Sequence, residues 1–201
     1  MTEAFETMAM KSIYESLAGL LDYPDGDWRS LIGSFVEIAA NERAENSHAL
    51  ASFREAVKAM SLSELQEVYT RTFDLSPVCT LDIGYHLFGE NYKRGVFLAN
   101  LRETEAPFDL GQGHQLPDYL PVLLRLLTKL DDEGLKSALV VDCMIPALEK
   151  MLAKLSEGEN PYRYLIGAVR ATLQTQVGVD SCEPEARAFK VRASLPIFQP
   201  A

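Results

Sequence analysis

Apolar residues recur at three- and four-residue steps along most of this 201-residue chain, and this pattern constrains its fold more than any other feature. The first example is the stripe formed by Met10, Ile13, Leu17, Leu20 and Leu21, which is typical of a helix with one buried face. No stretch of useful length alternates apolar and polar residues as a strand does. The sequence therefore predicts an all-α fold, a single-domain helical bundle of about eight to ten helices.

Capping residues predict where the helices in the first half of the chain begin and end. Ser61 followed three residues later by Glu64 is a capping box that opens a helix. Gly89 has the position of a helix-terminating glycine after a short helix over about residues 81–88. A further helix is expected over about residues 91–102.

Prolines divide the second half of the chain. Pro117 fits the first turn of a leucine-rich helix, where its missing N–H is not needed. Pro146 interrupts the periodic stretch 135–155, so we expect a kink or a break there. The pair Asn160-Pro161 is a typical start for a last helix.

Periodicity is absent from two other segments. Residues 103–115 contain one proline and two glycines and predict a long loop, a class of segment that is often functional. Periodicity is lost again after residue 177, where prolines become frequent. We therefore expect an all-α domain over residues 1–177 and an extended or disordered tail over residues 178–201.

The charge of the chain excludes some classes of partner. Its net charge is −10, which repels nucleic acid and anionic lipid and attracts cationic partners. The longest apolar runs are too short to span a bilayer, and residues 1–5 have no basic residue of the kind that opens a signal peptide. These features predict a cytoplasmic protein that binds no nucleic acid and does not insert into a membrane.

The familiar catalytic and cofactor motifs are missing. The sequence contains no GxSxG, no GxxxxGK[ST] and no HExxH. Glu45 and His48 have the spacing of a di-iron motif, but no second copy exists. Cys79, Cys143 and Cys182 are too widely spaced for a CxxC site, and Cys79 is best explained as a packed residue. We predict no catalytic residue, no cofactor and no metal.

Two charged positions leave alternatives open. Asp82 and His86 stand four residues apart and would share a helix face, so they can form an orienting hydrogen bond or contribute to a metal site. Asp118, in the first turn of the expected helix, would be stabilised by exposed N–H groups. It can also accept a cationic group from a ligand, or pair internally with Arg94.

Five short motifs, in this order, carry a resemblance to a known family. They are Leu17–Pro24, Leu65–Asp74, His86–Glu90 with Arg94-Gly95, Leu116–Pro121 and Asn160–Tyr162. With these motifs the chain resembles the NarJ-type molybdoenzyme assembly chaperones, the nitrate reductase delta-subunit family of redox enzyme maturation proteins. The segment Asp82–Tyr85 and the tail depart from the family pattern.

The resemblance implies a non-enzymatic, system-specific chaperone. Such proteins bind the N-terminal segment of the apo catalytic subunit of a molybdoenzyme in the cytoplasm, assist cofactor insertion and delay membrane attachment or export. The expected state is a monomer or weak dimer. The expected peptide-binding residues, which would supply apolar contacts and carboxylates in a helix-binding groove, are Tyr69, His86, Phe88, Glu90, Arg94, Asp118 and Tyr119. His86 would make the affinity sensitive to pH near neutrality.

Three other functions compete with this interpretation. The chain can be a permanent helical subunit of a respiratory complex, which predicts co-purification with the mature enzyme. It can be an all-α metal-dependent hydrolase built around Asp82, His86 and His114. It can also bind the molybdenum cofactor itself, although no phosphate-binding loop supports that function.

Overall fold

The computed structural model of the protein describes residues 2–41, 47–75, 79–111 and 113–177. Within these ranges the chain forms ten α-helices and one π-helical segment, and it contains no strand. The prediction of an all-α single-domain bundle is confirmed. The expected tail, residues 178–201, lies outside the described residues.

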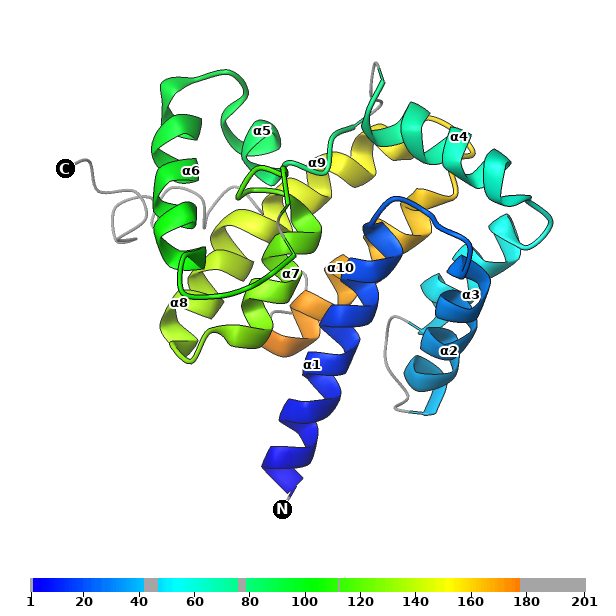
Figure 1. Ribbon diagram of the computed structural model, residues 1–201, viewed down its shortest axis with the longest axis horizontal. Coiled ribbons are helices and arrows are strands. Elements are labelled where there is room, and N and C mark those ends of the chain that lie inside the picture. Colours follow the sequence, from blue (N-terminus) through cyan, green and yellow to red (C-terminus); the bar gives the residue numbers. More distant parts are fainter. Residues whose placement is uncertain (1, 42–46, 76–78, 112, 178–201) are drawn as a thin grey trace.

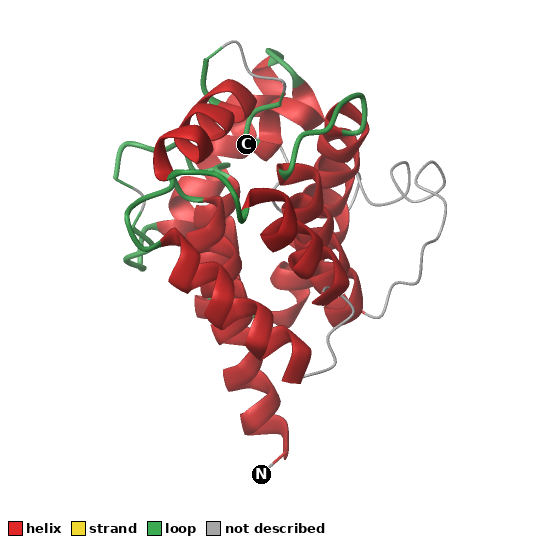
Figure 2. Ribbon diagram, turned by 90° about the vertical axis from the view of Figure 1, so that its right-hand side faces the viewer, coloured by secondary structure: helices red, strands yellow, loops and turns green. Residues whose placement is uncertain are grey.

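The first four helices form one side of the molecule. They are α1 (Thr2–Leu21), α2 (Trp28–Asn41), α3 (Ser47–Val57) and α4 (Leu62–Phe73). Figure 1 shows α2, α3 and α4 on one side of α1, whose N-terminal end extends beyond the other helices (Figure 2). The predicted capping box at α4 is confirmed, because the Ser61 hydroxyl accepts from the Glu64 N–H and the Glu64 carboxylate accepts from the Ser61 N–H.

The next helices form the other side, and α10 returns through the middle. They are α5 (Ile83–Phe88), α6 (Tyr92–Glu105), α7 (Leu120–Lys129), α8 (Glu133–Ala138), the π-helical segment η1 (Leu139–Met144), α9 (Ile145–Leu155) and α10 (Tyr162–Val177). Gly89 ends α5 with a positive φ of 60°, as its position predicts. Helix α6 continues to Glu105, so the following loop is shorter than expected.

Pro146 explains the π-helical segment. A proline has no N–H to donate to the carbonyl four residues earlier. The backbone hydrogen bonds of the residues just before Pro146 are rearranged as a result. The N–H of Ile145 donates to the carbonyl of Val140, five residues back, which is the π-helical pattern. The periodic stretch is therefore divided at this proline, with Pro146 in the first turn of α9.

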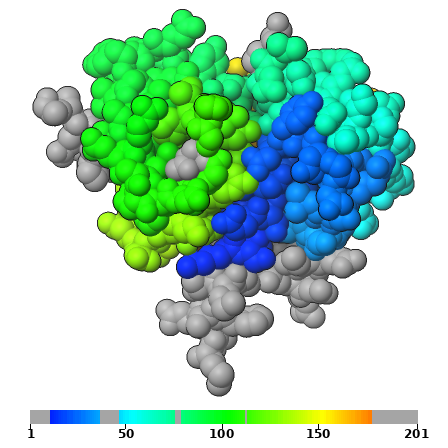
Figure 3. All heavy atoms as spheres, viewed as in Figure 1, coloured from blue at the N-terminus to red at the C-terminus, as the bar shows by residue number. Residues whose placement is uncertain are grey.

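The core is a single apolar cluster centred on α1, α7 and α10. Helix α1 packs along α7, and α10 packs against α9 and α3. Leu17, Leu21, Leu123 and Leu165, one or two from each central helix, are completely buried. In the space-filling view, α4 and the region of residues 81–120 meet the C-terminal end of α1 (Figure 3). This meeting point positions the candidate site.

Candidate functional site

A short backbone pairing joins the segment before α5 to the segment before α7. The N–H of Ile83 donates to the carbonyl of Asp118 at 2.9 Å, and the N–H of Leu120 donates to the carbonyl of Leu81 at 3.0 Å. Pro117 and Asp118 lie in a turn, Tyr119 is extended in this pairing, and α7 therefore begins only at Leu120. The prediction that Pro117 and Asp118 lie in the first turn of this helix is therefore wrong. Pro121 is the proline of that turn.

The side chain of Asp118 is held by an internal partner, as one of the sequence alternatives proposed. It is completely buried, and its Oδ2 accepts from Arg94 Nε at 3.2 Å and from the Gly84 N–H at 3.1 Å. Arg94 Nη2 lies 3.1 Å from the same oxygen and 3.3 Å from Asp82 Oδ2. We call Asp82, Gly84, Arg94 and Asp118 the Arg94 cluster. It fastens α5 and α6 to the start of α7.

Gly84 is the residue that makes this close approach possible. A Cβ at position 84 would lie 2.6 Å from Asp118 Oδ2 and 3.0 Å from Phe97 Cδ1. Both distances are shorter than ordinary contacts, so only glycine fits without displacing its neighbours. In the sequence, this segment stood out only as a departure from the family pattern, and the role of Gly84 was not predicted.

The Arg94 cluster has more negative than positive charge. One arginine serves two carboxylates, and the buried Asp118 Oδ1 has no hydrogen-bond partner. Burial raises the pKa of Asp118 to about 6, an effect that Asp82 reinforces and Arg94 opposes. Burial also raises the pKa of Glu105, at the end of α6, to about 7. Buried carboxylates that lack a full set of partners favour their protonated form.

A chain of tyrosines lies beside this cluster and links α1, α4 and α7. The Tyr69 hydroxyl is 3.0 Å from the Tyr119 hydroxyl and donates to the Leu21 carbonyl at 3.0 Å. The Tyr23 ring packs edge-on against Tyr69, with 5.4 Å between centroids. We call Tyr23, Tyr69 and Tyr119 the tyrosine junction. Tyr69 and Tyr119 are buried, and Tyr23 is 53% exposed.

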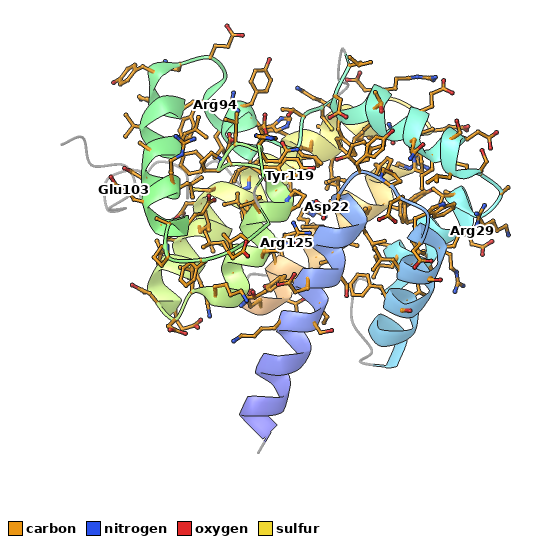
Figure 4. All side chains as sticks on the ribbon, viewed as in Figure 1. Asp22, Arg29, Arg94, Glu103, Tyr119 and Arg125 are labelled. Carbon is orange, nitrogen blue, oxygen red and sulfur yellow. The ribbon has the colours of Figure 1, made fainter. Side chains whose placement is uncertain are left out.

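Carboxylates from three different elements surround the tyrosine junction. Burial raises the pKa of Tyr119 to about 12, and the charges of Asp22, Asp74 and Asp82 contribute to this increase. Asp22 pairs with Arg125, and Figure 4 shows these two side chains close to Tyr119. Asp74 forms no ion pair among the described residues, and burial followed by the nearby Asp82 raises its pKa. Since Asp22 and Asp82 are paired with Arg125 and Arg94, Asp74 is the carboxylate of the three that is left to attract a cation.

An open depression of about 570 Å³ lies on the outer side of the tyrosine junction, between the α1–α2 turn and α4. Its apolar surface comes from Tyr23 and from Leu75, which is 72% exposed. We call it the α4 depression; its lining residues are Tyr23, Ser63, Gln66, Glu67, Thr70, Arg71 and Leu75. The α4 depression was not predicted from the sequence. Tyr23 could have been suspected from its place in the Leu17–Pro24 motif, whereas no signal marked Leu75.

His86 is buried, and hydrogen bonds at its side chain and its carbonyl hold α5 in place. Its Nε2 lies 2.8 Å from the Thr80 carbonyl, and Lys150 donates to the His86 carbonyl at 2.7 Å. The expected hydrogen bond between Asp82 and His86 is not formed, because Asp82 pairs with Arg94 instead. Burial lowers the pKa of His86, and Lys154 and Lys150 add to this effect.

The remaining predicted residues and motifs are distributed around these features. Phe88 is half-buried and packs against Phe97, with ring centroids 5.5 Å apart, and Glu90 is exposed just beyond α5. Cys79 is buried, as expected of a packed thiol. Glu45, of the Glu45–His48 spacing, lies outside the described residues.

Neither a metal site nor a membrane span is found in the described part of the chain. There, no three His, Cys, Asp or Glu side chains lie close enough to hold a metal. Asp82, His86 and His114, the residues of the hydrolase alternative, therefore form no such group. No helix of the described ranges is both long and apolar enough to cross a bilayer.

Comparisons with known proteins agree with the resemblance found in the motifs. A family model described as "Nitrate reductase delta subunit" matches residues 39–157. A probable nitrate reductase molybdenum cofactor assembly chaperone from Bacillus subtilis is 27% identical over 83% of this chain and 90% of its own length. A nitrate reductase molybdenum cofactor assembly chaperone from Escherichia coli K12 is 29% identical over 80% of this chain and 69% of its own.

Proposed function

Since the chain belongs to the nitrate reductase delta-subunit family, we propose that it is a non-enzymatic assembly chaperone for a molybdoenzyme. It binds the N-terminal segment of the apo catalytic subunit in the cytoplasm, assists cofactor insertion and delays membrane attachment. The similar proteins are named for nitrate reductase, so the catalytic subunit of a nitrate reductase is the client to try first.

The observation that carries this proposal is the α4 depression beside an acidic junction. Segments that direct export combine basic residues with an apolar stretch. The exposed side chains of Tyr23 and Leu75 offer apolar contact. The carboxylate of Asp74 forms no ion pair with a cation of the described residues, so it is free to bind a basic residue of the client. An amphipathic segment bound in a groove uses this combination of contacts.

The seven residues expected to bind the peptide take different parts in this proposal. Tyr69, His86 and Tyr119 are buried, and none of them is among the residues that line the α4 depression. Asp118 is buried with Arg94 bound to it, so direct contact with a client would require Arg94 to leave. We propose that the Arg94 cluster positions the site, and that client contact is made by the α4 depression.

The two remaining predicted residues, Phe88 and Glu90, lie at the end of α5 and just beyond it. Glu90 is exposed and Phe88 half-buried, so they can meet a client segment that continues past α5. Since the pKa of His86 is lowered by burial, any effect of its protonation on affinity should occur below neutral pH.

Isothermal calorimetry with a synthetic peptide copying the N-terminus of the client subunit tests this function. We expect binding that weakens when the basic residues of the peptide are replaced by glutamine, because cationic groups are then lost. Asp74→Lys should weaken binding about tenfold, whereas Asp131→Lys, which makes the same charge change at an exposed site after α7, should have little effect.

Failure of the peptide to bind folded protein would overturn the proposal. The competing function, a permanent subunit, is distinguished by purification. A chaperone should co-purify with the apo catalytic subunit, whereas a permanent subunit should co-purify with the mature, cofactor-loaded enzyme.

A further inference from the structure

The C-terminal end of this acidic chain is basic. Residues 186–201 include Arg187, Lys190 and Arg192 but no aspartate or glutamate, although the chain as a whole has a net charge of −10. The same segment contains five large apolar residues, namely Phe189, Val191, Leu195, Ile197 and Phe198. It thus combines cations with apolar side chains, which is the chemistry proposed above for a client segment.

The α4 depression has the complementary properties. Its exposed apolar side chains are Tyr23 and Leu75, and the exposed carboxylate of Asp74 beside it forms no ion pair among the described residues. The Glu67 carboxylate in its lining is exposed and, within the same ranges, pairs only with the equally exposed Arg71. A basic, apolar segment of the same molecule would find both kinds of partner there. Large exposed apolar side chains beside a charged rim are typical of a docking surface.

The segment is long enough to reach this surface. Helix α10 begins beside α4, because the Tyr162 ring packs on Phe73 and Tyr69. It has sixteen residues and ends at Val177, so its end lies about 24 Å from its start. The nine residues 178–186 can span up to about 30 Å when extended. Residues 187–201 can therefore lie against α4 without strain on α10.

We propose that residues 187–201 bind the α4 depression of their own molecule and compete there with the client segment. The proposal rests on the proposed function, since it uses the same surface. The tail then acts as an internal substitute for the client and covers the exposed Tyr23 and Leu75 until a client displaces it.

The expected strength of this competition follows from tethering. A flexible linker gives a tethered segment an effective concentration of about 1 mM. If the tail alone binds with a dissociation constant of about 0.1 mM, it lowers the apparent client affinity about tenfold. Such a weak interaction blocks nonspecific partners and yields to a client that binds more tightly.

Two measurements on the full chain test the proposal. The first is zero-length carbodiimide cross-linking of the monomer, read by mass spectrometry. The amine of Lys190 should be joined mainly to the carboxylates of Glu67 or Asp74, and these links should fade at high salt. Links from Lys190 mainly to other carboxylates, or no links from it, would overturn the proposal.

The second measurement is calorimetry with the client peptide. The variant R187E/K190E/R192E should bind this peptide about tenfold more tightly than the native chain. The matched control R54E/K93E/K129E makes the same change of net charge at exposed positions on α3, α6 and α7. An unchanged affinity in the tail variant, or an equal gain in both variants, would contradict internal competition.

The two proposals fail in different ways. If the client peptide binds no variant, the proposed function fails, and the cross-link map still decides whether the tail occupies the depression. If the peptide binds the native chain and the tail variant equally, the proposed function stands and only the tail proposal fails.

Discussion

The Arg94 cluster and the α4 depression lie on either side of the tyrosine junction, and they differ in almost every physical property. In the cluster, Asp118 is completely buried and Arg94 bridges it to Asp82. In the depression, Tyr23 and Leu75 are more than half exposed. The first region is closed to solvent, whereas the second is open to it.

This difference changes the interpretation of residues 85–121. This stretch contains six of the seven residues that the resemblance implied for peptide binding. In the structure, Arg94 and Asp118 form an ion pair that joins α5 and α6 to the start of α7. Four predictions, from the largest expected effect to the smallest, test this division between a closed joint and an open surface.

Replacing Asp118 by lysine should have the largest effect. A second cation beside Arg94, in a fully buried position, should lower the free energy of unfolding by about 3–5 kcal/mol. Urea unfolding followed by circular dichroism measures the loss, with Asp131→Lys as the exposed control. Normal stability together with lost peptide affinity would show instead that Asp118 faces the client.

Replacing Gly84 by alanine tests the close approach at the same joint. The new Cβ would meet Asp118 Oδ2 at 2.6 Å, so we expect a loss of about 1–3 kcal/mol in unfolding free energy. Gly95→Ala is the matched control, since a Cβ there meets nothing within 4 Å and alanine favours the helix. Equal stability of the two variants would contradict a packed joint.

The pH dependence of stability should report the buried carboxylates. The pKa of Glu105 is raised by burial to about 7, above its value in the unfolded chain. The folded state therefore holds this proton more tightly, and the stability it contributes at low pH is lost as pH rises toward 7. Glu105→Gln removes this contribution.

The unfolding midpoint of the native chain should accordingly fall relative to that of Glu105→Gln between about pH 5 and pH 8. Because the comparison is a difference between two variants, contributions from other titrating groups largely cancel. A constant difference across this range would mean that Glu105 does not change its protonation on unfolding.

Much of the fold could be predicted because its signals are local. Helical periodicity located the main helices, and the Ser61–Glu64 capping box and Gly89 marked two helix ends. The start of α7 was misplaced for the opposite reason. Its position depends on the backbone pairing between Leu81 and Leu120, which joins segments far apart in the chain and leaves no periodic signature.

The candidate site was less predictable than the fold. The sequence named Arg94 as a possible partner of Asp118, and the structure confirms this ion pair. It did not reveal that Asp118 is buried, because a charged residue is usually exposed. Leu75 follows a helix end without any motif, so only the three-dimensional arrangement shows its exposure beside Tyr23.

The central claim is that the client touches the α4 depression rather than the Arg94 cluster, and calorimetry on two variants tests it most directly. Leu75→Ser should bind the client peptide about tenfold more weakly, with unfolding free energy changed by no more than about 0.5 kcal/mol. Asp118→Asn should lose about 1–3 kcal/mol of stability, while its folded fraction binds the peptide as the native chain does. Native affinity in Leu75→Ser, together with weakened binding by folded Asp118→Asn, would contradict the account.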